Sequence, residues 1–133
     1  MAETIVVIDD DEDVRMVARL SLANGGFHVL ETGDPQEVIQ LTRARPVHLL
    51  LTDVVMPLMG GLELADRVRA LNASTRILLM SGYQTATIAR SRLPLIAKLF
   101  SSAALVCRVR EVLDRPSLFA RPAASIGPAT TQS

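Results

Sequence analysis

The chain has 133 residues, 49% of them hydrophobic, which is enough to bury the core of one domain. Fourteen basic and fourteen acidic side chains cancel, so no overall field is expected to draw the protein to nucleic acid or to an anionic membrane. The single cysteine, Cys107, excludes an internal disulfide and fits a reducing compartment. No segment approaches the ~20 apolar residues of a membrane span, so we expect a cytoplasmic protein.

The first half of the chain alternates short apolar runs with segments of helical periodicity. In chain order, the predicted elements are a strand at residues 4–8, a helix at 14–24, a strand at 28–32 and a helix from 35 to about 43. Gly25 and Gly26 end the first helix, because glycine reaches positive φ without a steric penalty. Asp34 and Pro35 are typical of an N-cap and a first helical residue.

The second half repeats the same alternation. It predicts strands at 47–52, 76–80 and 95–98. Leu64, Val68 and Leu71 mark a helix after the first of these strands, and a short helix at 84–92 follows the second. The last helix starts near Ser101 or Ser102 and is lined by Leu105, Val109, Val112 and Leu113. Cys107 has Val106 and Val109 as neighbours, which indicates a packed or half-packed thiol. Residues 116–133 contain three prolines and no periodicity, which predicts a flexible tail behind a domain of residues 1–115.

Five strand–helix units with short connections predict an α/β fold, a doubly wound five-stranded parallel sheet with helices on both faces. Ligands of such sheets bind at the carboxyl ends of the strands. The polar residues that follow the predicted strands are Asp9, Asp10, Asp53, Ser81 and Lys98. We therefore expect these five side chains to converge at one edge of the sheet.

Three of these residues, Asp9, Asp10 and Asp53, are carboxylates. Two unit charges about 5 Å apart repel by roughly 3 kcal/mol at an effective dielectric constant of about 20, so packed carboxylates need a positive charge among them. Oxygen donors without clustered histidine or cysteine are the ligands of a hard cation, and Mg²⁺ is the expected ion. The neighbouring Glu12 and Asp13 are more typical of a helix N-terminus.

Lys98 is the only lysine among the fourteen basic residues. The excess of arginine is explained by a general preference for arginine codons, which leaves Lys98 as the exception. Lysine is a compact point charge on a flexible stem, whereas arginine is a planar fork. We therefore interpret Lys98 as a residue whose site requires a point charge.

Four motifs at these positions resemble those of the receiver domain of bacterial two-component response regulators, over about residues 3–115. VVIDDDEDVR is similar to the family's acidic motif, LLLTDVVMPLMGGLEL to its phosphoacceptor loop, ILLMSGY to its Ser/Thr motif and AKLF to its lysine motif. The resemblance implies a receiver domain with a flavodoxin-like (βα)5 fold, and because nothing in the tail resembles an output domain, we expect a stand-alone receiver. It also implies a phosphoryl-accepting signalling switch rather than an enzyme.

The same resemblance implies a role for each site residue. Asp53 is the phosphorylated residue. The Mg²⁺ ligands are Asp9, Asp10, Asp53 and the backbone carbonyl of Val55, and the residues that receive the phosphoryl oxygens are Ser81 and Lys98. The implied phosphodonor is a sensor histidine kinase or a histidine phosphotransfer protein. The output target is another, unidentified protein, and we expect a monomer or weak dimer with no direct contact to nucleic acid or membrane.

The sequence departs from the family pattern in three places, of which the first two favour an alternative, a receiver-like interaction module that no longer accepts phosphate. Lys98 is followed by Leu99, where the family usually has proline. The segment from Ser81 to Lys98 is several residues shorter than is usual, and Leu95 stands at the family's aromatic position on the fifth strand.

A second alternative is a haloacid-dehalogenase-like phosphohydrolase. That family also uses a strand-end aspartate nucleophile with Mg²⁺, and Asp9 and Asp11 would be its first two aspartates. Mapping the phosphorylated residue separates the two families, since the hydrolase would be labelled on Asp9 and the receiver on Asp53.

Overall fold

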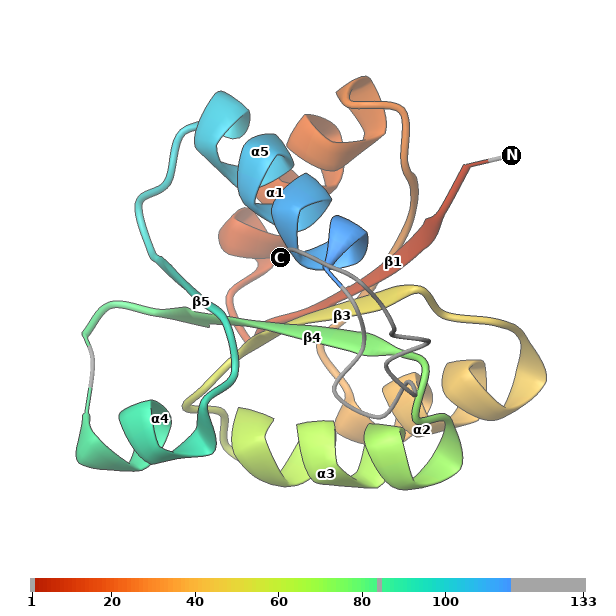
Figure 1. The fold of residues 1–133 in the computed structure, drawn as a ribbon, viewed down its shortest axis with the longest axis vertical. Helices are drawn as coiled ribbons and strands as arrows, with labels where there is room; N and C mark the ends of the chain where they lie inside the picture. The colour runs from red at the N-terminus through yellow and green to blue at the C-terminus, as the bar shows by residue number, and fades with distance from the viewer. Residues whose placement is uncertain (1, 84, 116–133) are drawn as a thin grey trace, which may run out of the picture.

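The computed structural model describes residues 2–83 and 85–115, and these residues form a sheet between two layers of helices (Figure 1). The strands are β1 (Thr4–Ile8), β2 (His28–Thr32), β3 (Leu49–Asp53), β4 (Arg76–Ser81) and β5 (Leu95–Ala97). They pair in the order β2-β1-β3-β4-β5, and every pair is parallel. The predicted five-stranded, doubly wound parallel sheet is thereby confirmed.

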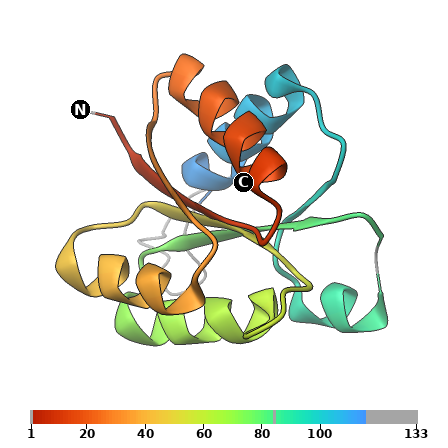
Figure 2. The ribbon, with the colours of Figure 1, turned by 180° about the vertical axis from the view of Figure 1, so that it is seen from behind.

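The helices are α1 (Glu12–Asn24), α2 (Pro35–Ala44), α3 (Gly61–Leu71), α4 (Ala86–Ser91) and α5 (Ser102–Asp114). Helices α1 and α5 cover one face of the sheet, and α2, α3 and α4 cover the other (Figures 1 and 2). None of the helices in the described part of the chain is long and apolar enough to span a bilayer.

The central strands are apolar on both sides because each side faces a helical layer. Ile5 and Val7 belong to the core cluster under α1 and α5, while Val6 and Ile8 belong to the cluster under α2 and α3. All four side chains are fully buried, and burying an aliphatic side chain of this size contributes about 1.5 to 3 kcal/mol. Successive strand residues point to opposite faces, so the unbroken apolar runs in the sequence are what a sheet covered on both faces requires.

Several element boundaries differ from the sequence prediction by one or two residues. The third strand begins at Leu49 rather than Val47, since the Val47 carbonyl accepts a hydrogen bond from the Thr75 hydroxyl at 2.8 Å instead of from a strand. The fifth strand ends at Ala97, although the Lys98 N–H still donates to the Ser81 carbonyl at 2.8 Å.

The fourth helix is shorter than predicted. It spans six residues, with Thr85 as its N-cap and Arg92, in the left-handed region at φ 59°, as its C-cap. The predicted first residue of this helix, Gln84, and the predicted tail at 116–133 lie outside the described residues.

The strand order defines where a site can form. β1 lies between β2 and β3, so the connections that leave β1 and β3 depart toward opposite sides of the sheet. At such a switch point the carboxyl ends of two neighbouring strands border a crevice in which ligands bind. Asp9 and Asp10 follow β1 and Asp53 ends β3, so these carboxylates lie at the switch point.

Candidate functional site

The acidic run behind β1 divides between the sheet edge and the first turn of α1. Asp9 is fully buried, and its Oδ1 accepts the Asp11 N–H at 2.9 Å. The Asp11 carboxylate in turn accepts the Asp13 N–H at 2.9 Å and caps α1. Glu12 and Asp13 lie in the first helical turn, which confirms their assignment to a helix N-terminus. Asp9 and Asp10 therefore remain as the acidic residues of the run at the sheet edge.

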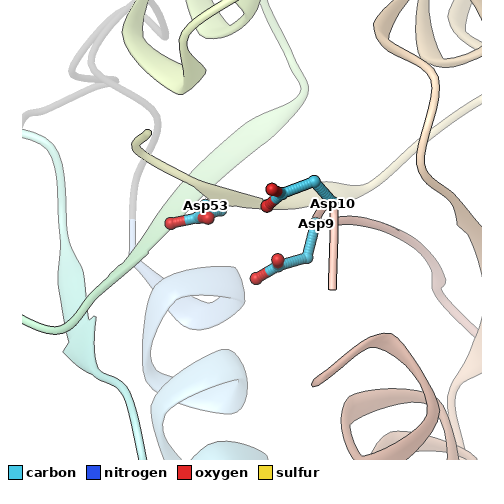
Figure 3. A group of neighbouring side chains, drawn as sticks. All are labelled: Asp9, Asp10 and Asp53. Atoms are coloured by element: carbon cyan, nitrogen blue, oxygen red, sulfur yellow. The ribbon is translucent and has the colours of Figure 1, made fainter. Parts of the chain in front are cut away.

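Asp53 brings the third carboxylate to this edge. It is the last residue of β3, is paired with Met80 of β4 and is only 6% exposed. The three side chains of Asp9, Asp10 and Asp53 gather around one space, with one oxygen of each lying within 4.8 Å of the others (Figure 3). The convergence predicted from the strand ends is confirmed for these residues.

Lys98 reaches into the same space from the end of β5. Its Nζ lies 3.0 Å from Asp9 Oδ2 and 3.1 Å from Asp53 Oδ2. Burial on its own would lower the pKa of Lys98, but the hydrogen bonds and negative charges of Asp9 and Asp53 outweigh it and raise the pKa above its usual value. Lys98 is therefore the ammonium that offsets part of the repulsion between two buried carboxylates.

The donor set fits a bound Mg²⁺ ion. Asp9 Oδ2 is buried without a hydrogen bond of good geometry, even though Lys98 Nζ lies close to it. Lys98 Nζ attracts this oxygen across 3.0 Å, and the oxygen keeps an open coordination position. Three carboxylates against one ammonium leave the cluster negative, and oxygen donors alone suit Mg²⁺. Val55 lies two residues after Asp53 with its side chain exposed, and the metal-binding role of its carbonyl stays a prediction.

The Asp9 carboxyl is costly to ionise in this site. Burial raises its pKa most, and the nearby Asp53 charge raises it further, whereas the Asp11 N–H and Lys98 act in the opposite direction. A raised folded-state pKa means that the contribution of Asp9 to stability is present below the ordinary carboxyl pKa and is lost as the pH rises through the folded-state value. In metal-free buffer at neutral pH, Asp9 therefore destabilises the fold.

We expect Asp9→Asn to raise the free energy of unfolding at pH 7 in buffer that contains a chelator, because the substitution removes the buried charge and keeps the size. The gain should shrink at pH 4, where Asp9 itself takes up a proton. Urea denaturation at both pH values measures the difference. If Asp9→Asn were less stable than the parent at pH 7, the raised pKa of Asp9 would be contradicted. Adding Mg²⁺ should stabilise the parent more than Asp9→Asn, because the variant lacks one charged metal ligand.

Ser81 ends β4 at the same edge, but its hydroxyl is engaged locally. Ser81 Oγ donates to the Tyr83 carbonyl and accepts the Tyr83 N–H at 3.2 Å. Ser81 pairs with Ala97, next to Lys98, so the two predicted phosphoryl-contacting residues come from adjacent strand ends. The hydroxyl has to leave Tyr83 before it can contact a ligand at the carboxylates.

The residue after Lys98 has an unusual backbone conformation. Leu99 has φ 67° and a fully exposed side chain. A proline ring holds φ near about −65°, so the family's usual residue does not fit the backbone as it stands here. The left-handed conformation costs an ordinary L-residue about 1 to 2 kcal/mol.

We expect Leu99→Gly to raise the free energy of unfolding by about 0.5 to 1 kcal/mol, because glycine accepts positive φ and the leucine side chain contributes no burial. Leu99→Ala is the matched control, since it removes the same side chain but keeps the strain, and it should be nearly neutral. Urea denaturation of the two variants separates backbone strain from side-chain contacts. Equal stability of the two would show that Leu99 carries no strain.

A second basic residue near the site escaped the sequence-based prediction. Arg15 Nη1 donates to the Asp9 carbonyl at 2.8 Å, while its Nε donates to Glu31 at 3.1 Å. Arg15 therefore braces the end of β1 from the first turns of α1 and ties it to β2. Its position as the first basic residue after five consecutive acids is the signal that points to it.

A doubly wound sheet with three carboxylates and a lysine at its switch point, and a serine at the end of the adjacent strand β4, is the arrangement expected of a phosphoryl-accepting signalling domain. The family model of the response regulator receiver domain matches residues 5–106. The chain belongs to the response regulator receiver domain family.

Curated relatives agree with this assignment. The chain is 33% identical over 79 residues to the response regulator receiver protein CpdR of Brucella abortus, a match that covers 59% of this chain and 66% of that protein. It is 37% identical over 84 residues to the DNA-binding transcriptional regulator NtrC of Azospirillum brasilense, covering 63% of this chain and 18% of that protein. The chain thus spans less than two thirds of the length of either relative.

Solved structures give the same fold. The receiver domain of the hybrid histidine kinase CckA aligns with a TM-score of 0.72 at 28% identity, covering 84% of this chain and 99% of that one. The chemotaxis protein CheY4 of Vibrio cholerae aligns with a TM-score of 0.79 at 20% identity, with the same coverage. The second likeness, at this low identity, concerns the fold alone.

Proposed function

We propose that this protein is a phosphoryl-accepting switch of a two-component system in which Asp53 is the phosphoacceptor. The observation that carries the proposal is the position of the Asp53 carboxylate, which lies at a strand end, 3.1 Å from Lys98 Nζ and within reach of Asp9 and Asp10. Among the described residues, these groups form the cluster of three carboxylates suited to a metal ion.

The chemistry follows from the charges. An Asp53 carboxylate oxygen attacks phosphorus, the bond from phosphorus to the donor atom breaks, and its electron pair leaves with the donor, so that an aspartyl phosphate forms. Lys98 holds its positive charge beside the nucleophile and neutralises part of the phosphoryl charge. Asp9, Asp10, Asp53 and the Val55 carbonyl would hold Mg²⁺, which when bound supplies further positive charge at the phosphoryl oxygens.

The proposed switch connects the site to the edge of the sheet. Ser81 would exchange its bonds to Tyr83 for one to a phosphoryl oxygen. The Lys98 N–H donates to the Ser81 carbonyl, so a displacement of Ser81 is transmitted directly to the end of β5. The face built by α4, β5 and α5 would then change its population of conformations on phosphorylation.

A sensor histidine kinase or a histidine phosphotransfer protein is the proposed phosphodonor. The relatives include the autoinducer sensor kinase LuxN of Vibrio harveyi and the sensor kinase CckA of Brucella abortus, in which the matched region is 9% and 13% of the protein. We further propose that the chain is not itself an enzyme beyond accepting and slowly losing the phosphoryl group.

The structure gives no support to the phosphohydrolase alternative. That interpretation needs Asp11 in the site as a second catalytic aspartate. The Asp11 carboxylate instead accepts the Asp13 N–H as the cap of α1.

The proposal is tested with a small phosphodonor such as acetyl phosphate in the presence of Mg²⁺. We expect the mass of the protein to rise by one phosphoryl group, the label to map to Asp53, and a chelator to prevent it. Beryllofluoride, which mimics a phosphoryl group, should bind only together with Mg²⁺. Joint failure of labelling and of beryllofluoride binding would support the module that no longer accepts phosphate.

A further inference from the structure

The three carboxylates of the cluster are held to different degrees. Asp9 accepts the Asp11 N–H at 2.9 Å and lies 3.0 Å from Lys98 Nζ. Asp53 lies 3.1 Å from the same Nζ. The exposed Asp10 carboxylate makes no hydrogen bond or ion pair within the described part of the chain. Its position therefore depends on the backbone that carries it, which is the peptide group between Asp9 and Asp10.

Arg15 holds this peptide group from α1. Its Nη1 donates at 2.8 Å to the Asp9 carbonyl oxygen, which belongs to the Asp9–Asp10 peptide. Because a peptide group is planar, a hydrogen bond to its oxygen restricts the direction in which the chain continues to Asp10. The guanidinium group is a rigid planar fork, and only 18% of the Arg15 side chain is exposed. The fork is therefore a firm support for the peptide.

The other arm of the fork is anchored on β2. Arg15 Nε donates to Glu31 Oε1 at 3.1 Å, and Arg19 Nε donates to the second oxygen, Oε2, at 2.6 Å. Glu31 is the partner of Val7 in the ladder between β1 and β2. Arg15 thus bridges the ends of two strands, whereas the hydrogen bond of Arg19 within the described residues runs to β2 alone.

The fork needs free space beside it, and Gly33 provides that space. A Cβ at Gly33 would lie 2.9 Å from Arg15 Nη1 and 3.6 Å from the Asp9 carbonyl oxygen. Gly33 does not have positive φ, a conformation that only Gly26 adopts among the described glycines. The backbone of Gly33 therefore accepts alanine, and what the position requires is the absence of a side chain.

Ligands held in one arrangement affect different cations differently. Mg²⁺ requires near-ideal octahedral geometry at short distances, whereas Ca²⁺ accepts about six to eight oxygen ligands in flexible arrangements. A site with fixed ligands favours Mg²⁺, and a site whose ligands can spread loses that preference. Groups that orient metal ligands commonly change the metal affinity by about 10- to 100-fold.

We propose that Arg15 is a positioning residue that makes the carboxylate cluster selective for Mg²⁺ over Ca²⁺ by fixing the Asp9–Asp10 peptide. Arg15 acts through the Asp9 carbonyl and is not itself a ligand, because a guanidinium group has no acceptor atom. The inference rests on the metal site of the proposed function, but it does not require phosphorylation of Asp53.

The charge of Arg15 acts in the opposite direction. A cation close to the cluster repels Mg²⁺ and Ca²⁺ alike, so removing the charge alone would tighten the binding of both ions. Loss of the positioning contact should weaken the binding of Mg²⁺ in particular. Because the two effects differ in sign, affinity measurements with the two ions separate them.

The test is an NMR titration of the backbone amide signals of the parent and each variant with Mg²⁺ and, separately, with Ca²⁺. Arg15→Gln should bind Mg²⁺ about tenfold more weakly and Ca²⁺ less than about threefold more weakly. Arg15→Lys keeps the charge but lacks the fork that reaches the Asp9 carbonyl and Glu31 together, so it should also lose most of the preference for Mg²⁺.

Gly33→Ala moves the fork without changing any charge. The added methyl group should displace Arg15 Nη1 from the Asp9 carbonyl, and the preference for Mg²⁺ should fall as in Arg15→Gln. The fold should be kept, because the displaced group is the end of a flexible side chain. Urea denaturation checks the folding of each variant, and if Arg15→Gln is unfolded, the ratio of the two affinities in Gly33→Ala decides.

Arg19→Gln is the matched control. It removes the same charge from the same helix and the same partner, Glu31, but no hydrogen bond to the Asp9 carbonyl, so it should keep the preference of the parent. Tighter binding of both ions in Arg15→Gln would show that only the charge matters and would overturn the proposal. An unchanged affinity ratio in Arg15→Gln, or an equal fall in Arg19→Gln, would also overturn it.

The outcome is separable from the proposed function. If the parent loses its preference for Mg²⁺ in Arg15→Gln but takes no label from acetyl phosphate, the role of Arg15 stands and the phosphoryl switch is refuted. Labelling of Asp53 without any effect of Arg15→Gln on the affinity ratio would do the reverse. A parent that binds neither ion would refute both the metal site and the role of Arg15.

Discussion

Gly61→Ala is expected to lower the free energy of unfolding by about 3 kcal/mol or more, which would be a large effect for the addition of one methyl group. Gly61 is the first residue of α3, and its N–H donates to the Val54 carbonyl at 2.8 Å. A Cβ at this position would lie 2.1 Å from the backbone oxygen of Asp53 and 3.1 Å from Thr52 Oγ1. Since the obstructing atom belongs to the backbone of β3, no side-chain rotation relieves the clash.

The neighbouring glycine supplies the control. A Cβ at Gly60 would have the Val54 carbonyl oxygen, at 3.5 Å, as its nearest contact, and the Gly60 backbone has φ −67°, which alanine adopts freely. Gly60→Ala should cost less than about 1 kcal/mol, mostly through the weaker N-cap. Urea denaturation gives both values, and Mg²⁺ titration adds a second readout, because the displaced Asp53 backbone should weaken metal binding only in Gly61→Ala. Similar stabilities of the two variants would refute the close approach of α3 to β3.

This pair of glycines also shows where prediction from sequence stops. In MPLMGGLEL the two residues are equivalent as signals of a turn before a helix. Only the packing of α3 against the end of β3 distinguishes them, and that approach depends on contacts between segments that local patterns do not encode. The strands, in contrast, are predictable from short stretches of sequence, because a strand buried on both faces requires an uninterrupted run of apolar residues.

The buried faces of the helices are less predictable from the sequence than the strands are. The sequence predicts a packed or half-packed Cys107, yet Cys107 is exposed, and Val17 of α1 is 46% exposed as well. In α5 the buried residues Leu105, Val109 and Val112 define the inner face, and Cys107 falls on the other side of the helix. Apolar residues occur around much of both helices, so periodicity alone left the inward face ambiguous.

The site was predictable because topology brings strand ends together. The Asp9–Asp10 pair, Asp53 and Lys98 lie far apart in the chain but at the carboxyl ends of parallel strands. The structure brings one oxygen of each carboxylate within 4.8 Å of the others and places Lys98 in contact with Asp9 and Asp53. The bonds between Ser81 and Tyr83 were not predictable, since they depend on the path of the loop after β4.

Asp53→Asn is expected to reduce labelling by acetyl phosphate in the presence of Mg²⁺ to background. The amide keeps the shape of the side chain but has no carboxylate oxygen to attack phosphorus. The variant should remain folded, because it loses one contact to Lys98 and one repulsion with Asp9 together. Intact-protein mass spectrometry and urea denaturation measure the two quantities on the same sample.

Asp10→Asn distinguishes the nucleophile from the metal ligands. Asp10 is exposed and shares the carboxylate cluster, but, unlike Asp53, it makes no ion pair with Lys98 in the described structure. Its amide variant should still be labelled, at a higher Mg²⁺ concentration than the parent requires, because one charged ligand is lost while the nucleophile stays in place. Full labelling of Asp53→Asn combined with loss of the label in Asp9→Asn would move the nucleophile to β1, as in a phosphohydrolase. Loss of labelling in Asp53→Asn with a Mg²⁺-dependent remainder in Asp10→Asn would instead assign the covalent step to Asp53 and the metal to the cluster around it.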